Sequence, residues 1–327
     1  MGKTLFCDFE FLKAFSSSCP QHNDNPLEDD PVEAWRKVYR YIYHANCEVI
    51  GSQPFDVLVS IMNKQPLLWK LLKGKRFRYH FVQDVFNQNM PASNATSVLF
   101  TALNKANREK LQSLYGIIAV GQDDVLQFES SVKGRSIHLS ARNRSQHSWK
   151  DIEIPDASKI SNSLIIVDNY ILKDTKKFDK NIFSILDVML PQETEIPYHI
   201  SVFTKIFGSE EDMQLRYEKI VDETKRIRPK LDFMFEIRDA DEFFHDRKMV
   251  TNNAYFTIGK GFDIFPLDKR DTDLHVSFPF LYDSEEEISY YALLKKLSTI
   301  EYRKFGKHIW SDSPMTNRLL EIFQEKE

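Results

Sequence analysis

The chain has 327 residues, which is more than one hydrophobic core commonly holds, so we expect two domains. Hydrophobic residues make up 42% and charged residues 28%, a balance that is typical of globular proteins and excludes disordered or collagen-like chains. Because 44 basic residues against 48 acidic ones leave a net charge of only −4, contact with nucleic acid or an acidic membrane needs a local basic patch.

The first 155 residues predict an α/β domain of uncertain fold. The clearest element is a helix from Pro31, because Trp35, Val38, Tyr39 and Ile42 recur at helical spacing. The other elements that we expect here are strands over 3–12, 76–82, 116–120, 125–128 and 136–139, and helices over 54–63, 66–72 and 93–114. Weak patterning then places the domain boundary near residue 155.

Residues 156–327 alternate clearly between strands and helices, which favours an α/β sandwich with a largely parallel sheet. We expect strands over 163–170, 198–203, 231–237, 248–251, 254–258 and 274–281, and helices over 179–189, 210–228, 285–305 and 314–324. The predicted fold class is therefore α/β in both parts of the chain.

Compartment is indicated by what the sequence does not contain. No apolar run approaches the roughly 20 residues that a membrane span requires. The first residues reach acids before a signal peptide could form. Three cysteines, Cys7, Cys19 and Cys47, are odd in number and widely spaced, which favours a reducing compartment. We expect a cytoplasmic protein with no transmembrane segment.

The stretch most informative about function runs from Phe244 to Asp263. His245 precedes a predicted strand, and Arg247 lies two residues further on the same strand face, so both side chains could converge on one phosphate. After a turn at Asn252, a second strand ends at Gly259-Lys260-Gly261, where small residues let backbone N–H groups approach an anion. The pattern indicates an anion site.

This spacing resembles the HxK(x)4D(x)6GSxN motif of the phospholipase D superfamily, whose His, Lys, Asp and Gly correspond here to His245, Arg247, Asn252 and Gly259. In that family the His is the nucleophile toward a phosphodiester, the Lys binds phosphoryl oxygens and the Asp supports the site. Arg247 still suits phosphate, whereas Asn252 supplies no negative charge. The resemblance implies a degenerate catalytic motif, with His245 and Arg247 as its catalytic candidates, and an intact anion site.

A closer resemblance is to the phospholipase D-like C-terminal domain of MIT-domain proteins that act with the ESCRT machinery. Its three short motifs correspond, in the same order, to Asp168-Asn169-Tyr170, His245-Asp246-Arg247 and Gly259-Lys260-Gly261-Phe262-Asp263. The resemblance covers about 163–281 and implies binding of acidic phospholipid rather than cleavage. Because the chain shows no three-helix MIT module, a relative with a different partner fits equally well.

Three further residues join the predicted phosphate site. Asp168 and Tyr170 follow the first strand of the second part, where ligands of open sheets collect, and Lys205 follows the next strand. Their alternatives are a helix cap, a core aromatic residue and a solvated lysine. The complete set of predicted phosphate-binding residues is Asp168, Tyr170, Lys205, Arg247, Asn252, Gly259 and Lys260.

Two weaker patterns lie in the first 155 residues. Asp8 and Glu10 lie on one face of a predicted strand, and PIN-type nucleases that hold Mg²⁺ also have an acid on an early strand. Asp123 and Asp124 could complete such a cluster of carboxylates. The alternative is a solvated strand edge. Two basic regions suit nucleic acid or a solvated strand face, namely Lys73 to His80, and Arg135, Arg142, Arg144, His147 and Lys150. No zinc spacing, Walker loop or dinucleotide fingerprint occurs, so we expect no cofactor and no metal.

The sequence favours a non-catalytic or weakly catalytic protein that recognises a phosphate-bearing ligand, either nucleic acid or acidic phospholipid. The alternative is a metal-independent phosphodiesterase or nuclease. Enzymes of the phospholipase D family bring two such motifs together, and this chain has one. Catalysis would therefore need a homodimer in which two His245 side chains meet one phosphate, and membership of a larger assembly stays open.

Overall fold

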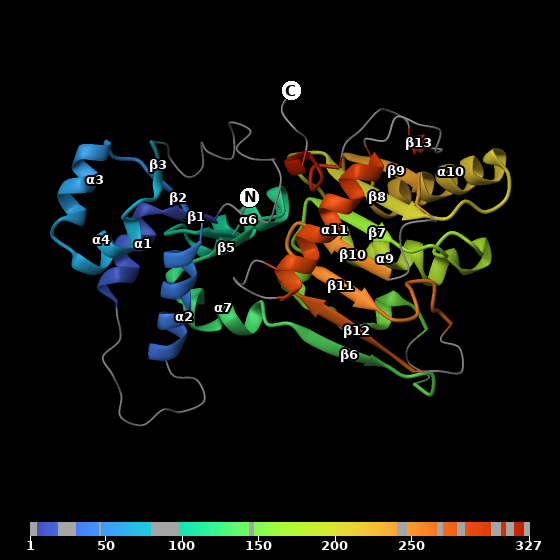
Figure 1. The fold of residues 1–327 in the computed structure, drawn as a ribbon, viewed down its shortest axis with the longest axis horizontal. Coiled ribbons are helices and arrows are strands. Elements are labelled where there is room, and N and C mark those ends of the chain that lie inside the picture. Colours follow the sequence, from blue (N-terminus) through green and yellow to red (C-terminus); the bar gives the residue numbers. More distant parts are fainter. Residues whose placement is uncertain are drawn as a thin grey trace.

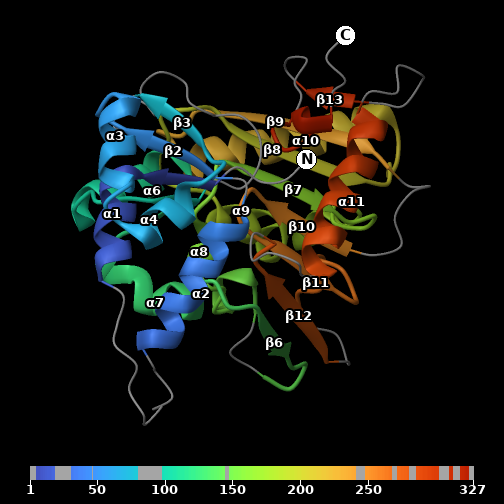
Figure 2. The ribbon, with the colours of Figure 1, turned by 60° about the vertical axis from the view of Figure 1, so that its left-hand side comes forward.

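The fold is taken from a computed structural model of the chain (Figure 1), which describes residues 5–18, 31–45, 47–79, 98–143, 147–240, 247–266, 271–279, 285–301, 309–311 and 317–323. Two β-sheets, each covered by helices, lie side by side, and Figure 2 shows the first of them from a second side. The predicted α/β class is confirmed. Among the described residues, no helix is long and apolar enough to cross a membrane.

The first sheet is parallel throughout and has the strand order β3-β2-β1-β4-β5. Its strands are β1 (Leu5–Asp8), β2 (Cys47–Gly51), β3 (Arg76–Tyr79), β4 (Val98–Phe100) and β5 (Ile118–Val120). The helices of this part are α1 (Phe9–Ser17), α2 (Pro31–His44), α3 (Phe55–Met62), α4 (Pro66–Leu72), α6 (Lys105–Tyr115) and α7 (Val125–Ser131), with the short turn η1 (Gln122–Asp124). In this order the winding direction changes between β1 and β4, so their carboxyl ends border the crevice where such sheets bind ligands.

Several predicted elements of this part are wrong. The strand expected over 3–12 ends at Asp8, whose carboxylate caps α1 by accepting a hydrogen bond from the backbone N of Glu10 at 3.1 Å. The strand expected over 125–128 is helix α7, and the helix expected over 93–114 contains strand β4. Strand β2 was not predicted.

The second sheet is mixed and has the order β13-β9-β8-β7-β10-β11-β12-β6. Its strands are β6 (Arg135–Leu139), β7 (Ser163–Val167), β8 (Tyr198–Thr204), β9 (Phe233–Asp239), β10 (Arg247–Thr251), β11 (Tyr255–Ile258), β12 (Thr272–Ser277) and β13 (Ile309–Ser311). Only β7, β8 and β9 run parallel, so the expected largely parallel sheet is wrong. Both faces of β7 are buried, which is why the strand is almost entirely apolar.

Helices cover both faces of this sheet. They are α8 (Asp156–Lys159), α9 (Ile182–Met189), α10 (Glu210–Ile227) and α11 (Glu285–Glu301), with the short turns η2 (Trp149–Asp151), η3 (Thr175–Lys180) and η4 (Glu321–Phe323). On one face Ile165 and Val167 of β7 pack in a cluster with Tyr290 and Leu294 of α11. On the other face, Ile166 belongs to the main core together with residues of α9 and α10.

The sheets divide the chain earlier than residue 155. Strand β6 pairs antiparallel with β12, with Ile137 opposite Leu274. Trp149 is fully buried, and its ring nitrogen donates to the carbonyl of Phe262 at 2.9 Å. Strand β6 and the segment 147–154 therefore contribute to the second sheet and its core. The division into two domains, as separate folding units, stays a prediction.

Candidate phosphate site

The carboxyl end of β7 and the β10–β11 hairpin meet at one edge of the second sheet. Because β10 runs antiparallel to β7 with Lys248 opposite Val167, Arg247 lies level with Asp168. Arg247 also pairs with the last residue of β11, so the turn Gly259–Gly261 begins beside it. The strand register thus brings three of the predicted features together.

Asp168 is a buried carboxyl that fixes two backbone segments. Its side chain is only 1% exposed, and its two oxygens accept hydrogen bonds from the backbone N–H groups of Tyr170 and Phe262. Burial raises the pKa of Asp168 to about 6; the charge of Asp263 adds to the rise, while the two backbone hydrogen bonds and Arg247 oppose it. Asp168 therefore positions the glycine turn from beneath.

Gly261 lets the turn close over Asp168. Its φ is +102°, and a Cβ atom there would lie 2.8 Å from Oδ2 of Asp168 and 3.4 Å from Cγ of Arg247. At Gly259, by contrast, the nearest atom to such a Cβ is the Thr272 hydroxyl at 4.0 Å. Of the two glycines, only Gly261 is required by its surroundings.

Tyr170 carries two cations over its ring. The guanidinium carbon of Arg247 lies 5.8 Å from the ring centroid and the amino group of Lys173 lies 5.6 Å from it. The side chain of Tyr170 is 38% exposed, so the core alternative for this residue is excluded. The predicted site therefore gains Lys173, whose signal in the sequence is the lysine-rich stretch 173–180.

Asp263 and Lys177 complete the charges at this edge. Burial raises the pKa of Asp263, and the nearby charges of Lys177, Arg247 and Lys173 oppose that rise. Burial thus opposes the ionised form of both carboxyls of the site, which lie among Lys173, Lys177 and Arg247. The balance favours an anion at the surface of this edge.

The remaining predicted residues fall in different places. Lys260 is exposed on the glycine turn, and Lys205 is half-buried directly after β8, which is the parallel neighbour of β7. His245 lies outside the described residues, two positions before the start of β10. Its role as a nucleophile stays a prediction.

Asn252 is not brought to this edge. It lies in the turn at the opposite end of the hairpin, about 15 Å away by the length of β10. Its Nδ2 donates to the carbonyl of Gly116 and its Oδ1 accepts from the backbone N of Asn162, both at 2.8 Å. Asn252 therefore joins the two sheets of the molecule rather than contacting a ligand at Arg247.

The carboxylates predicted to form a magnesium site in the first sheet are separately bound. Asp8 accepts hydrogen bonds from the Thr101 hydroxyl at 3.2 Å and the Ala102 backbone N at 3.1 Å, and burial raises its pKa. Glu10 points to Lys13, with 3.5 Å between the charged atoms. These two acids therefore have local structural roles.

Arg108 occupies the space between the other two acids. Its buried guanidinium donates to both oxygens of Asp123, at 2.8 and 2.9 Å, and lies 3.0 Å from a carboxylate oxygen of Asp124. This contact lowers the pKa of Asp123. Among the residues that the structure describes, no three His, Cys, Asp or Glu side chains gather in a way that could hold a metal ion.

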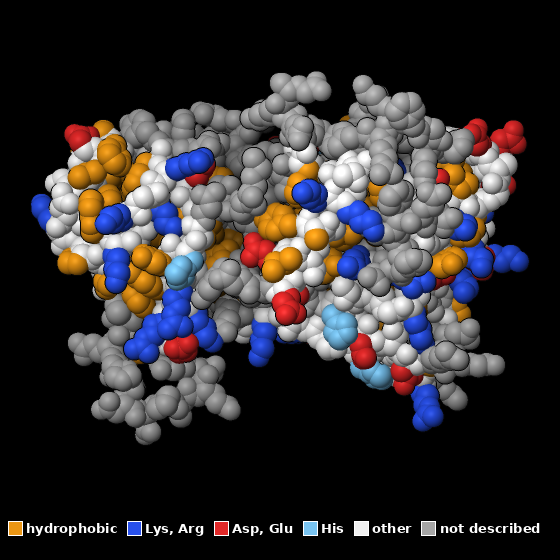
Figure 3. Space-filling model, viewed as in Figure 1, with side chains coloured by type: hydrophobic (Ala, Val, Ile, Leu, Met, Phe, Trp, Pro, Cys, Tyr) orange, Lys and Arg blue, Asp and Glu red, His pale blue; other side chains and the backbone are white. Residues whose placement is uncertain are grey.

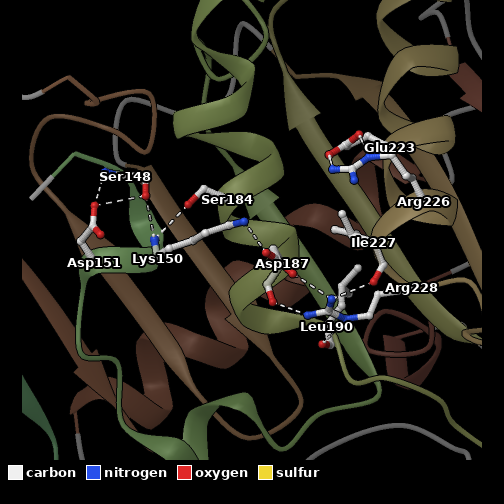
Figure 4. Close-up of polar contacts among 10 residues, drawn as sticks. All are labelled: Ser148, Lys150, Asp151, Ser184, Asp187, Leu190, Glu223, Arg226, Ile227 and Arg228. Carbon is white, nitrogen blue, oxygen red and sulfur yellow. Dashed lines mark hydrogen bonds and ion pairs between the residues drawn. The ribbon is translucent and has the colours of Figure 1, made fainter.

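The second basic region is partly structural. Lys150 forms an ion pair with Asp187, and its backbone N donates to the Ser184 hydroxyl at 2.9 Å (Figure 4). The same carboxylate accepts from Arg228 at 2.8 Å, so it links the segment before residue 155 to α9 and α10. Arg135 and Arg142 are exposed, and Arg144 lies outside the described residues.

Comparisons with known proteins identify no family for this chain. No protein-family model matches the chain and no curated protein matches it. Among solved structures, the archaeal chromatin protein TrmBL2, described as showing a novel mode of DNA binding, matches with 11% identity over 81% of this chain and 82% of its own. Its TM-score of 0.22 is too low to support a conclusion about fold or function.

Proposed function

We propose that this chain is a non-catalytic or weakly catalytic protein that binds a phosphate-bearing ligand at the carboxyl edge of β7. The observation that carries the proposal is the glycine turn, which a buried Asp168 holds against the stem of Arg247. The guanidinium suits two phosphate oxygens at once, and a turn rich in glycine lets backbone N–H groups approach an anion. Lys173 and Lys260 add positive charge.

The resemblance to phospholipase D-like domains supports the same edge from the sequence. The residues that suit phosphate binding, Arg247 and the glycine turn, lie together, whereas the counterpart of the supporting Asp, Asn252, lies at the far end of the hairpin. This arrangement favours binding over turnover. The ligand class, nucleic acid or acidic phospholipid, is decided by experiment.

The test measures binding of pyrophosphate, a probe small enough to occupy one site, by calorimetry. We expect Arg247→Ala and Lys260→Ala each to weaken binding by about tenfold, since each removes a charge-assisted contact of roughly 1.5 kcal/mol. The matched control is Lys248→Ala, which removes a cation from the same strand but from its opposite face. Equal losses in all three variants would contradict the proposal. Labelled DNA, RNA and phosphoinositide vesicles then identify the ligand.

A turnover assay with EDTA decides the alternative. Metal-independent cleavage that disappears in His245→Ala, by a protein that is dimeric in solution, would establish a phosphodiesterase of phospholipase D type. A monomer that binds without cleaving supports the proposal.

A further inference from the structure

Positive charge is concentrated in one stretch of the chain. Residues 36–78 contain nine Lys and Arg and only two Asp and Glu, although the whole chain has a net charge of −4. In the described part of this stretch, the strands β2 and β3 with α3 and α4 lie at the outer end of the first sheet, and α2 packs between α4 and α7 (Figure 1). It is separate from the phosphate site, which belongs to the second sheet.

Helix α2 turns the basic part of this stretch toward solvent. Its buried side carries Trp35, Val38, Tyr41 and Ile42. Five residues on the other side are exposed and cover about a third of the circumference of the helix. This surface, which we call the α2 face, consists of Arg36, Lys37, Arg40, Tyr43 and His44. Figure 3 shows Lys and Arg side chains gathered over α2 beside a His and several hydrophobic side chains.

Lys75 fixes the neighbouring segment against the end of this helix. Its amino group donates to the carbonyls of Ile42, Tyr43 and Ala45 at 3.1, 2.9 and 2.6 Å. A cation at this position neutralises the negative end of the helix dipole. Lys73 and Arg76, both exposed and within two residues of this contact, extend the positive surface past the end of α2.

A column of stacked rings supports the aromatic part of the α2 face. Phe15 of α1 stacks on Trp35 with centroids 4.8 Å apart, Trp35 on Tyr39 at 5.2 Å, and Tyr39 on Tyr43 at 6.1 Å. Phe15 and Trp35 are buried, Tyr39 is half-buried, and the last ring, Tyr43, is 42% exposed. The column therefore holds one aromatic ring at the surface among cations, and ordering that ring costs little further entropy on binding.

We propose that the α2 face binds single-stranded nucleic acid, with Arg36, Lys37 and Arg40 on successive phosphates and a base stacked on Tyr43. Cations beside an exposed aromatic ring are the pattern by which proteins hold single strands, because the ring needs a base that is not already paired and stacked in a duplex. An acidic membrane fits less well. A helix that binds a membrane inserts its apolar side, and that side of α2 is packed in the core.

The experiment measures the affinity of the full chain for a labelled oligouridylate of 20 nucleotides, by fluorescence anisotropy over a range of salt concentrations. In Arg36→Gln/Arg40→Gln we expect affinity to fall about tenfold or more, and the salt slope to shrink by about 1.4 as two phosphate contacts are lost. The matched control is Lys105→Gln/Lys110→Gln, which removes two exposed cations from α6 in the same part of the chain; we expect a change below about twofold. Tyr43→Leu should weaken binding about tenfold and Tyr43→Phe should restore it, because only the ring is needed.

Four outcomes would overturn the proposal: no binding of the oligonucleotide by the wild type, equal losses in the α6 control, equal binding by Tyr43→Leu and the wild type, or preferential binding of vesicles rich in phosphatidylserine. The result is separable from the phosphate site. If Arg247→Ala abolishes oligonucleotide binding while the α2-face variants do not, the nucleic acid is held at the second sheet and the α2 face is not its site. If Arg247→Ala leaves oligonucleotide binding intact and the α2-face variants weaken it, the α2 face is supported as the binding site, even if pyrophosphate does not bind at the second sheet.

Discussion

At the scale of single residues, one buried carboxyl organises the candidate phosphate site. Asp168 is almost completely buried, and its two oxygens accept hydrogen bonds from the backbone of Tyr170 and of Phe262, which follows the glycine turn. Burial makes its ionised form costly, and Arg247 beside it compensates only in part. The structure therefore gives Asp168, which was predicted to bind phosphate, the role of positioning the backbone of the turn.

The raised pKa of Asp168 predicts a pH dependence of stability. Its pKa is about 6 in the folded chain against an ordinary 3.8, so the folded state holds this proton more tightly than the unfolded state. The resulting stabilisation is fully present below pH 3.8 and is lost as the pH rises through 6. Relative to Asp168→Asn, which cannot ionise, we expect the unfolding free energy of the wild type to fall by about 2–3 kcal/mol between pH 4 and 7 in urea titrations. A constant difference across this range would contradict the assignment.

At the scale of elements, the sequence predicts best those helices that have a long and regular pattern of apolar residues. Helix α10 was expected over 210–228 and spans Glu210–Ile227, because Ser209 and Asp212 form a capping box ahead of a periodic stretch. Helix α7 was mistaken for a strand because four residues, 125–128, fit both periods. Its helical signal appears only over a longer window, where Val125, Phe128 and Val132 are buried on one side.

The sequence predicted the part of the candidate site that lies on the β10–β11 hairpin. The spacing between Arg247 and the glycine turn specified which residues share an end of β10 and β11. Lys173 was missed because its position depends on how the chain folds back after β7, which no local pattern encodes. Asp263 belongs to the matched motif but was not assigned to the site, because its place beside Asp168 depends on the turn that precedes it. The α2 face was missed because only the apolar side of that helix was interpreted.

The turn after β11 gives the prediction for this scale. Gly261→Ala places a methyl group against Asp168 and adopts a φ that side chains rarely take, so we expect a loss of about 1–3 kcal/mol from the backbone alone. We also expect weaker pyrophosphate binding, because the turn must shift. Gly259→Ala, two residues away with open space around its Cβ, should change the unfolding free energy by less than about 0.5 kcal/mol. Chemical denaturation of both variants checks this, and equal losses would show that the turn is not held as described.

At the scale of the whole molecule, the end of α6 joins the two sheets. The Gly116 carbonyl accepts from Asn252 at 2.8 Å and from Asn253 at 3.0 Å, and the Tyr115 carbonyl accepts from Asn162 at 2.9 Å. The main hydrophobic core also runs without a break from residues of the first sheet to residues of the second. Length alone favoured two domains, but a shared core and buried hydrogen bonds across the joint favour unfolding as one unit.

A pair of glycine variants tests this joint. Gly116 has φ +63° and a Cβ there would lie 2.2 Å from the Ser161 backbone, whereas Gly74 has φ +80° with nothing within 4 Å. Both Gly→Ala changes carry the left-handed backbone cost of about 1–2 kcal/mol, so their difference isolates the contact between the two parts. In calorimetry we expect one transition for the wild type and for Gly74→Ala, and for Gly116→Ala a larger loss with the transition divided in two. Two transitions in the wild type would show instead that the parts unfold independently, and the buried asparagines at Gly116 would then be too few to couple them.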